Sequence, residues 1–78
     1  MSDRLIDLFA SVLSVESTAL REDSSPENTS AWDSVTNMML VASIEEEFGI
    51  ELTSDEIVEM TTIGSARAIL QKRLVAVA

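Results

Sequence analysis

The sequence DSVTNMMLVASIEEEFG occupies residues 33–49 and has the composition and the boundaries of a single helix. Aspartate is a common helix N-cap and glycine a common C-terminal cap, and residues 34–48 between them contain neither glycine nor proline. At about 100° per residue, one side of this helix collects apolar residues that are expected to face a core: Leu40, Val41, Ile44 and Phe48. We therefore predict a helix over residues 34–48.

A second apolar group lies on roughly the opposite side of the same helix, where Glu45 and Glu46 interrupt and flank it. Its members are Val35, Met38, Met39 and Ala42. A helix with two apolar sides cannot bury both against one neighbour. It is either surrounded by other elements or presents an apolar strip to a partner.

Three further helices are predicted around this one. The apolar spacing after Asp3 favours a helix over about residues 3–15, and a capping box of Thr53 and Glu56 begins a short helix over about 54–60. Apolar residues at helical spacing then indicate a helix over about 64–74. No alternating apolar run supports a sheet.

Residues 16–33 are polar, contain Pro26, and form a long loop that Leu20 and Trp32 are expected to anchor. The predicted fold is all-α: a small four-helix bundle with three longer helices, one short helix and a long loop between the first two helices. A chain of 78 residues is expected to form a single domain, residues 1–78.

The composition excludes several classes of function. Fourteen acidic and five basic residues give a net charge of −9, which repels nucleic acid and anionic lipid. The chain has no Cys, His or Tyr, so a disulfide framework, a Cys/His zinc site and a catalytic triad are excluded. No loop has the ligand spacing of a calcium sensor, and no other metal site is expected. No apolar run would cross a membrane and no signal-peptide pattern is present, so we expect a soluble, cytoplasmic protein. We also expect it to be a monomer.

The charges are unevenly distributed along the chain. Residues 22–66 hold eleven acidic residues and no basic one, whereas Arg67, Lys72 and Arg73 are the only charged residues that follow. The three basic residues are expected to complement the dipole of the last helix. The acidic stretch is either a set of solvated helix surfaces or a negative face that steers association with basic patches on partners.

Ser34 is the candidate residue for chemistry. It follows Asp33 where the long loop meets the helix, and free backbone amides at a helix N-terminus favour a nearby phosphate. The dipeptide alone is weak, because Asp23-Ser24 is a second copy and a capping aspartate followed by the first helical residue is the simpler explanation.

Motifs on either side supply a context for this serine. Asp33-Ser34-Val35 is followed by helical apolar spacing, and then by Glu45-Glu46-Glu47-Phe48-Gly49-Ile50, Asp55-Glu56-Ile57 and Met60-Thr61-Thr62-Ile63. This order closely resembles the acyl carrier protein family, whose attachment motif is usually Asp-Ser-Leu. The resemblance is strong from Trp32 to Leu70, about half of the chain, and the first helix and long loop agree with it in position.

The resemblance implies that a phosphopantetheinyl transferase, with Mg²⁺ and coenzyme A, joins a 4′-phosphopantetheine arm to Ser34, and that Asp33 orients this reaction. The arm's thiol would hold an acyl group as a thioester, so a chain without cysteine would gain one reactive thiol. The protein would be a carrier, not an enzyme. It would serve acyl-loading and acyl-transfer enzymes with basic docking patches, in fatty-acid, polyketide or specialised acyl synthesis.

The resemblance also assigns two sets of residues. The bundle interior, where family members can shelter an acyl chain, would be lined by Met38, Leu40, Ile44, Leu52, Ile57, Met60, Ile63 and Ile69. The face shown to partner enzymes would carry Val35, Met39, Ala42, Glu45 and Glu46.

Some positions depart from the family pattern. Val35 stands where leucine is usual, and Thr36 and Met39 stand where fatty-acid carriers often have acidic residues. These departures leave the arm assignment intact and the set of partners open. Two alternatives remain: an aminoacyl or peptidyl carrier that uses the same arm, and an acidic helical adaptor whose apolar strip binds a partner helix without any covalent group.

Overall fold

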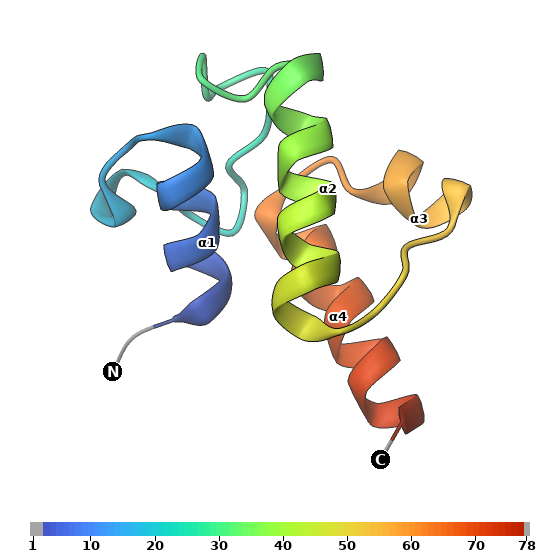
Figure 1. Cartoon of the computed structure of the whole chain (residues 1–78). Coiled ribbons are helices and arrows are strands. Elements are labelled where there is room, and N and C mark those ends of the chain that lie inside the picture. Colours follow the sequence, from blue (N-terminus) through green and yellow to red (C-terminus); the bar gives the residue numbers. More distant parts are fainter. Residues whose placement is uncertain (1–2, 78) are drawn as a thin grey trace.

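The computed structural model describes residues 3–77, and the side chains of residues 3–73, as a helical fold. Its elements are α1 (Arg4–Leu13), η1 (a 3-10 turn, Ser17–Ala19), α2 (Ser34–Phe48), α3 (Ser54–Glu59) and α4 (Ile63–Val77). Figure 1 shows α2 at the centre, with α1 on one side and the short α3 on the other. Over these residues the predicted all-α bundle of three longer helices and one short helix, with a long first loop, is confirmed.

Two helices differ from their predicted ranges by more than one residue, and α3 ends one residue before the predicted position 60. The first helix is shorter than residues 3–15, because Asp3 is its N-cap and Ser14 adopts a left-handed backbone conformation with φ 57° that ends it. The last helix is longer than residues 64–74, because it begins at Ile63 and continues to Val77. The single turn η1 also interrupts the loop that the sequence predicts to be irregular.

The caps of α2 and α3 are those that the sequence predicts. Asp33 accepts the Val35 and Thr36 backbone N–H groups at the start of α2, and Gly49 ends this helix with φ 66°. A residue with a Cβ is strained in that left-handed region, so glycine is favoured there. At the start of α3, Thr53 and Glu56 form the reciprocal bonds of a capping box.

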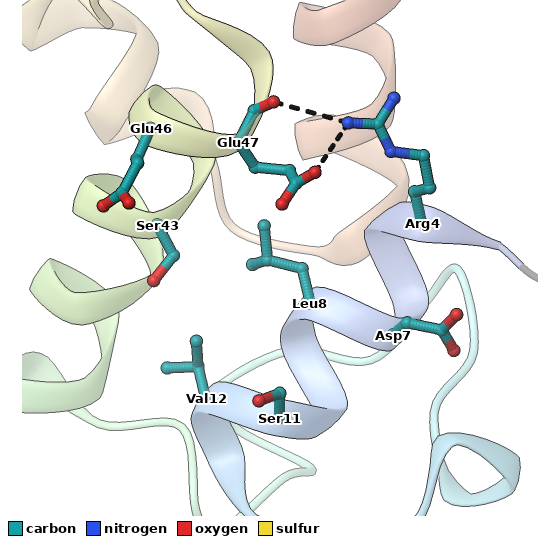
Figure 2. Close-up of a pocket in the computed structure, with 8 residues that line it drawn as sticks. All are labelled: Arg4, Asp7, Leu8, Ser11, Val12, Ser43, Glu46 and Glu47. Carbon is teal, nitrogen blue, oxygen red and sulfur yellow. Dashed lines mark hydrogen bonds and ion pairs between the residues drawn. The ribbon is translucent and has the colours of Figure 1, made fainter.

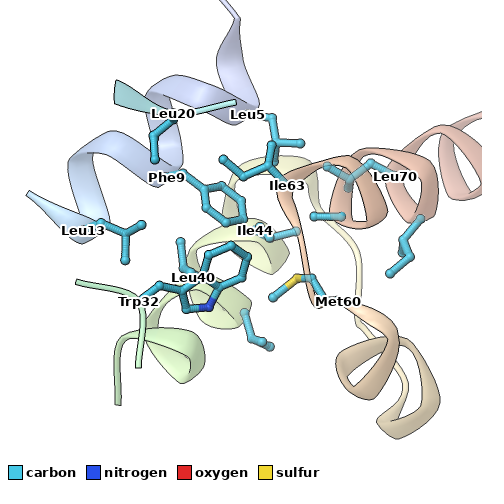
Figure 3. Close-up of a cluster of buried hydrophobic side chains, with 13 residues drawn as sticks. Leu5, Phe9, Leu13, Leu20, Trp32, Leu40, Ile44, Met60, Ile63 and Leu70 are labelled. Atoms are coloured by element: carbon cyan, nitrogen blue, oxygen red, sulfur yellow. The ribbon is translucent and has the colours of Figure 1, made fainter. Parts of the chain in front are cut away.

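One hydrophobic core joins the helices and the long loop (Figure 3). Phe9 of α1 and Trp32 at the end of the loop meet edge to face, with ring centroids 5.2 Å apart. Around them lie the other buried apolar side chains: Leu5, Leu13, Leu20, Leu40, Val41, Ile44, Met60, Ile63, Ala66, Ile69 and Leu70. Leu20 and Trp32 are therefore the anchors of the loop, as the sequence predicts.

The long loop is also tied to α4 through its backbone. The Ile63 and Gly64 N–H groups donate to the Ser24 and Glu22 carbonyl oxygens at 3.1 and 2.8 Å, respectively. A Cβ on Gly64 would lie 3.1 Å from the same Glu22 oxygen, so a glycine permits this close approach. The first two N–H groups of α4, which have no partner within the helix, are thus satisfied by the loop.

The two arginines of α4 connect segments and do not cap the helix. Arg67 forms ion pairs with Asp3 and Glu22, both at 2.7 Å. Arg73 donates to Glu56 of α3 and to the Glu51 carbonyl oxygen. The prediction that Arg67, Lys72 and Arg73 complement the helix dipole is wrong, because the last turn of α4 holds no basic residue.

Candidate functional site

Ser34 is the first residue of α2 and is exposed. Its neighbour Asp33 caps the helix through one carboxylate oxygen, Oδ1, which accepts the Val35 and Thr36 N–H groups at 3.0 and 2.9 Å. The Thr36 hydroxyl accepts the Asp33 N–H and donates to the Ala31 carbonyl oxygen. These bonds fix the backbone on both sides of Ser34 and leave its hydroxyl at the surface.

The same hydrogen bonds keep Asp33 ionised. The Thr36 backbone N–H is the largest of several donors that hold the pKa of the Asp33 carboxyl below its usual value, against a smaller opposing effect of desolvation. No hydrogen bond within residues 3–77 reaches the other carboxylate oxygen, Oδ2. An ionised carboxylate with one free oxygen therefore stands beside the serine.

The second Asp-Ser pair differs from the first in its surroundings. Ser24 is only 5% exposed, and its hydroxyl oxygen accepts the Arg21 backbone N–H at 2.8 Å. A large prosthetic group on this hydroxyl would have to enter the core or break the loop. Of the two pairs, only Asp33-Ser34 offers an accessible hydroxyl.

A shallow pocket of about 340 Å³ lies next to Ser34. Its walls come from the long loop, the start of α2, and α3 with the residues after it: Pro26, Glu27, Asp33, Ser34, Asn37, Ile57, Val58, Met60 and Thr61. The pocket combines carboxylates at one part of its lining with apolar side chains at another.

Trp32 and Asn37 form a contact that sequence patterns do not indicate. The indole Nε1 of Trp32 donates to Asn37 Oδ1 at 3.0 Å, across the N-terminus of α2. Asn37 thereby connects the core, through Trp32, with the pocket beside Ser34. The two residues are five positions apart across a helix cap, a spacing that no standard pattern includes. The only indication in the sequence is that a buried indole N–H usually requires a polar partner.

The residues assigned to the partner face fall on one side of α2. Val35, Met39, Ala42 and Glu46 are all exposed and spaced to form one stripe along the helix. Glu45 lies beside this stripe, where its carboxylate accepts the Leu52 N–H at 2.9 Å and so supports the loop after α2. Sequence reasoning missed Val58 of α3, which is exposed and lines the Ser34 pocket.

Most of the residues assigned to the bundle interior lie there. Leu40, Ile44, Met60, Ile63 and Ile69 are buried, and Leu52 and Ile57 pack against the core while partly exposed. The assignment of Met38 to the interior is wrong, because this residue is 58% exposed. Helical spacing places Met38 with Val35 and Met39 on the side of α2 away from the core, and the structure agrees with that spacing and not with the interior position that the resemblance implies.

A separate groove of about 440 Å³ runs between α1 and α2 (Figure 2). Arg4 pairs with Glu47 at 2.6 Å at one end, and Leu8 and Val12 contribute its apolar part. Glu46 lines this groove, so the stripe on α2 ends at its edge. Ser34 does not line it.

No helix within residues 3–77 has the length and apolar character needed to cross a membrane.

A family model described as a phosphopantetheine attachment site matches residues 3–70. Acyl carrier proteins from two strains of Porphyromonas gingivalis are each 30% identical to the chain over 71 residues, which cover 91% of this chain and 91% of theirs. The residues that the family model matches include α1 and the long loop, where the sequence contains no diagnostic motif. The chain therefore belongs to the acyl carrier protein family, and its prosthetic group is a covalently attached 4′-phosphopantetheine.

Proposed function

We propose that Ser34 is the attachment residue and that the protein carries acyl groups to partner enzymes of fatty-acid, polyketide or specialised acyl synthesis. The observation that carries this proposal is the contrast between the two Asp-Ser pairs. Ser34 is exposed beside a pocket, whereas Ser24 is buried with its hydroxyl oxygen accepting a backbone N–H.

The residues around Ser34 fit the prosthetic group. An exposed hydroxyl at the start of a helix can be joined to a phosphate without displacing core side chains, and the adjacent pocket has room for part of the arm. When bound, the group supplies the thiol that forms acyl thioesters. Asp33 has two proposed roles. Its Oδ1 holds the start of α2 by accepting backbone N–H groups, and its Oδ2 is available to the transferase or to the Mg²⁺ that the transferase uses.

The proposed docking face is the stripe of Val35, Met39, Ala42 and Glu46. Between Ser34 and Ile44 the helix has no acidic residue, so partner contacts close to the arm are apolar and the charged contacts lie toward the end of α2. Exposed acidic groups there would mainly raise the rate of association with basic patches.

Docking can be tested with single charge changes. Glu46→Gln should lower the association rate with the transferase and weaken its salt dependence. Glu16→Gln removes the same charge from an exposed position in the loop and is the control. If both variants associate at the wild-type rate at every salt concentration, steering by this end of α2 is wrong.

The buried residues Leu40, Ile44, Met60, Ile63 and Ile69 are the proposed lining for a sheltered acyl chain. Ile57 and Met60 contribute both to the core and to the pocket beside Ser34, so they form the route by which a chain would enter. Methionine adapts its shape more readily than branched residues, which suits an interior that must open.

The attachment can be tested by intact mass. The purified protein, incubated with coenzyme A, Mg²⁺ and a transferase of broad specificity, should gain the mass of one phosphopantetheine group. Ser34→Ala should prevent the gain. Ser54→Ala is the matched control, because Ser54 is likewise an exposed first residue of a helix. A gain that survives Ser34→Ala would refute the assignment.

A further inference from the structure

The side-chain amide of Asn37 is held in one orientation by the core. Trp32 is 1% exposed, its ring packs edge to face on Phe9, and its Nε1 donates to Asn37 Oδ1 at 3.0 Å. An indole nitrogen is only a donor, so the atom of the amide that faces it must be the oxygen. The amide nitrogen, Nδ2, therefore points away from Trp32.

The two N–H groups on Asn37 Nδ2 have no acceptor within residues 3–77, since the contact with Trp32 is the only side-chain hydrogen bond of Asn37 there. They are also not sealed in the core, because no polar side-chain atom of the described residues is both buried and without a partner. Asn37 lines the pocket beside Ser34 and lies one turn beyond it on α2. An oriented donor pair is thus available where an arm attached to Ser34 would begin.

We propose that Asn37 binds the phosphopantetheine arm, with Nδ2 donating a hydrogen bond to an amide carbonyl oxygen of the pantetheine. This inference rests on Ser34 as the attachment residue. Trp32 is a positioning residue, because it keeps the amide from rotating and so reduces the entropy that the bond would otherwise cost.

The chemistry of the pocket favours a carbonyl over the phosphate as the acceptor. Glu27 and Asp33 line the same pocket and would repel a phosphodiester drawn inward. Carbonyl oxygens of the arm are neutral and are not repelled. Ile57 and Val58 offer apolar contacts for the methyl groups of the pantetheine, so the pocket matches an amphipathic chain with few charges.

The first test uses the wild-type protein before and after loading, with both forms verified by intact mass. The side-chain ¹⁵N–¹H resonances of Asn37, assigned through Asn37→Asp, should shift on loading, with one proton moving downfield as it gains an acceptor. The ³¹P resonance of the phosphodiester should be the same in loaded wild type and loaded Asn37→Asp. Unmoved Asn37 resonances would overturn the proposal, and a change confined to ³¹P would overturn the carbonyl as acceptor.

The second test measures the protection of the arm. Asn37→Asp keeps an oxygen for the Trp32 indole and removes the amide donors, whereas Gln71→Glu makes the same change of charge at an exposed position of α4. In the loaded proteins, alkylation of the thiol by a small neutral reagent should be roughly two- to tenfold faster in Asn37→Asp, the effect of losing one hydrogen bond. Equal rates in the two variants would overturn the proposal.

Trp32→Phe provides a further check, since it keeps an aromatic ring against Phe9 and removes the indole donor. It should accelerate alkylation by less than Asn37→Asp does, because the amide is freed to rotate but still present; a rate equal to wild type would overturn the positioning role. If neither the wild type nor any of these variants gains the mass of the arm, the assignment of Ser34 as the attachment residue is wrong. If the wild type is loaded but the Asn37 resonances and the alkylation rates do not change, only the role of Asn37 is wrong.

Discussion

Replacing Arg67 with methionine would remove the charge that joins α4 to α1 and to the long loop. Arg67 donates to Glu22 through Nε and Nη2 at 2.7 and 2.9 Å, and to Asp3 through Nη2 at 2.7 Å. Solvent reaches 42% of the Asp3 side chain and 55% of that of Glu22, so each pair belongs to the screened class, worth up to about 1 kcal/mol. We expect the variant to lose about 1–2 kcal/mol of unfolding free energy at neutral pH.

The loss should depend on pH in a defined direction. The hydrogen bonds from Arg67 are the largest cause that holds the pKa values of Asp3 and Glu22 below their usual range. A carboxyl with a lowered folded pKa stabilises the protein fully above its unfolded pKa, about 4, and loses this contribution as pH falls through the folded value. The difference between wild type and Arg67→Met should therefore be full above about pH 5 and shrink in acid.

Urea denaturation followed by fluorescence of Trp32, the one tryptophan in the chain, measures this difference. With a slope of about 1 kcal/mol/M, the midpoint should fall by roughly 1–2 M, and by less in 1 M salt. Lys72→Met is the control, because it removes the same charge from an exposed position of α4 that forms no ion pair within the described residues. An equal loss in both variants would refute the reasoning and assign the effect to the change in net charge that they share. A loss insensitive to pH and salt would also refute it and assign the effect to packing of the Arg67 side-chain stem.

Three other predictions concern the caps and the α3 connection. Gly49→Ala should lower the unfolding free energy by about 1 kcal/mol through backbone strain alone, because the added Cβ meets no atom within 4 Å, and Gly49→Asn should lose less; equal midpoints in urea would contradict this. Thr53→Ala should cost about 1 kcal/mol by removing the N-cap of α3, and thermal unfolding that is unchanged would argue against it. Glu56 has a pKa of about 2 because of Arg73 and the Thr53 N–H, so its contribution is present above its usual value near 4.5 and is lost as pH falls from there toward 2. Titration of stability should show this loss in wild type and a weaker one in Glu56→Gln, with Glu59→Gln, an exposed residue of the same helix, behaving as wild type.

The features that the sequence predicts well are those set by residues close together in the chain. The caps at Asp33, Gly49 and Thr53 each depend on hydrogen bonds over two to four positions, or on one residue's own backbone preference, so local chemistry is sufficient. Leu20 and Trp32 were recognisable as anchors because they are the large apolar residues of a polar segment. The assignment of Ser34 stays a proposal, and in the sequence it depends on the motifs that follow the serine.

Most of the features that escaped prediction are contacts between side chains that the local sequence pattern does not connect. Arg67 contacts Asp3 across 64 positions, and nothing in the local pattern separates this role from dipole compensation. Met38 was misplaced by the resemblance to the family, although its helical spacing already puts it on the side of α2 away from the core. The orientation of Asn37 required the position of a buried indole that periodicity does not supply.

The attachment of the long loop to α4 through backbone atoms has a consequence for sequence tolerance. The Glu22 and Ser24 carbonyl oxygens are present whatever the side chains at those positions, so the junction should survive replacement of Glu22 or Asp23 by unrelated residues. Position 64 is different, since any Cβ would push against the Glu22 oxygen. In hydrogen exchange, the amides of Ile63 and Gly64 should report the local opening of this junction separately from global unfolding. The exchange rates of these two amides could therefore rank a library of loop variants by how often the junction opens, provided that every variant keeps Gly64.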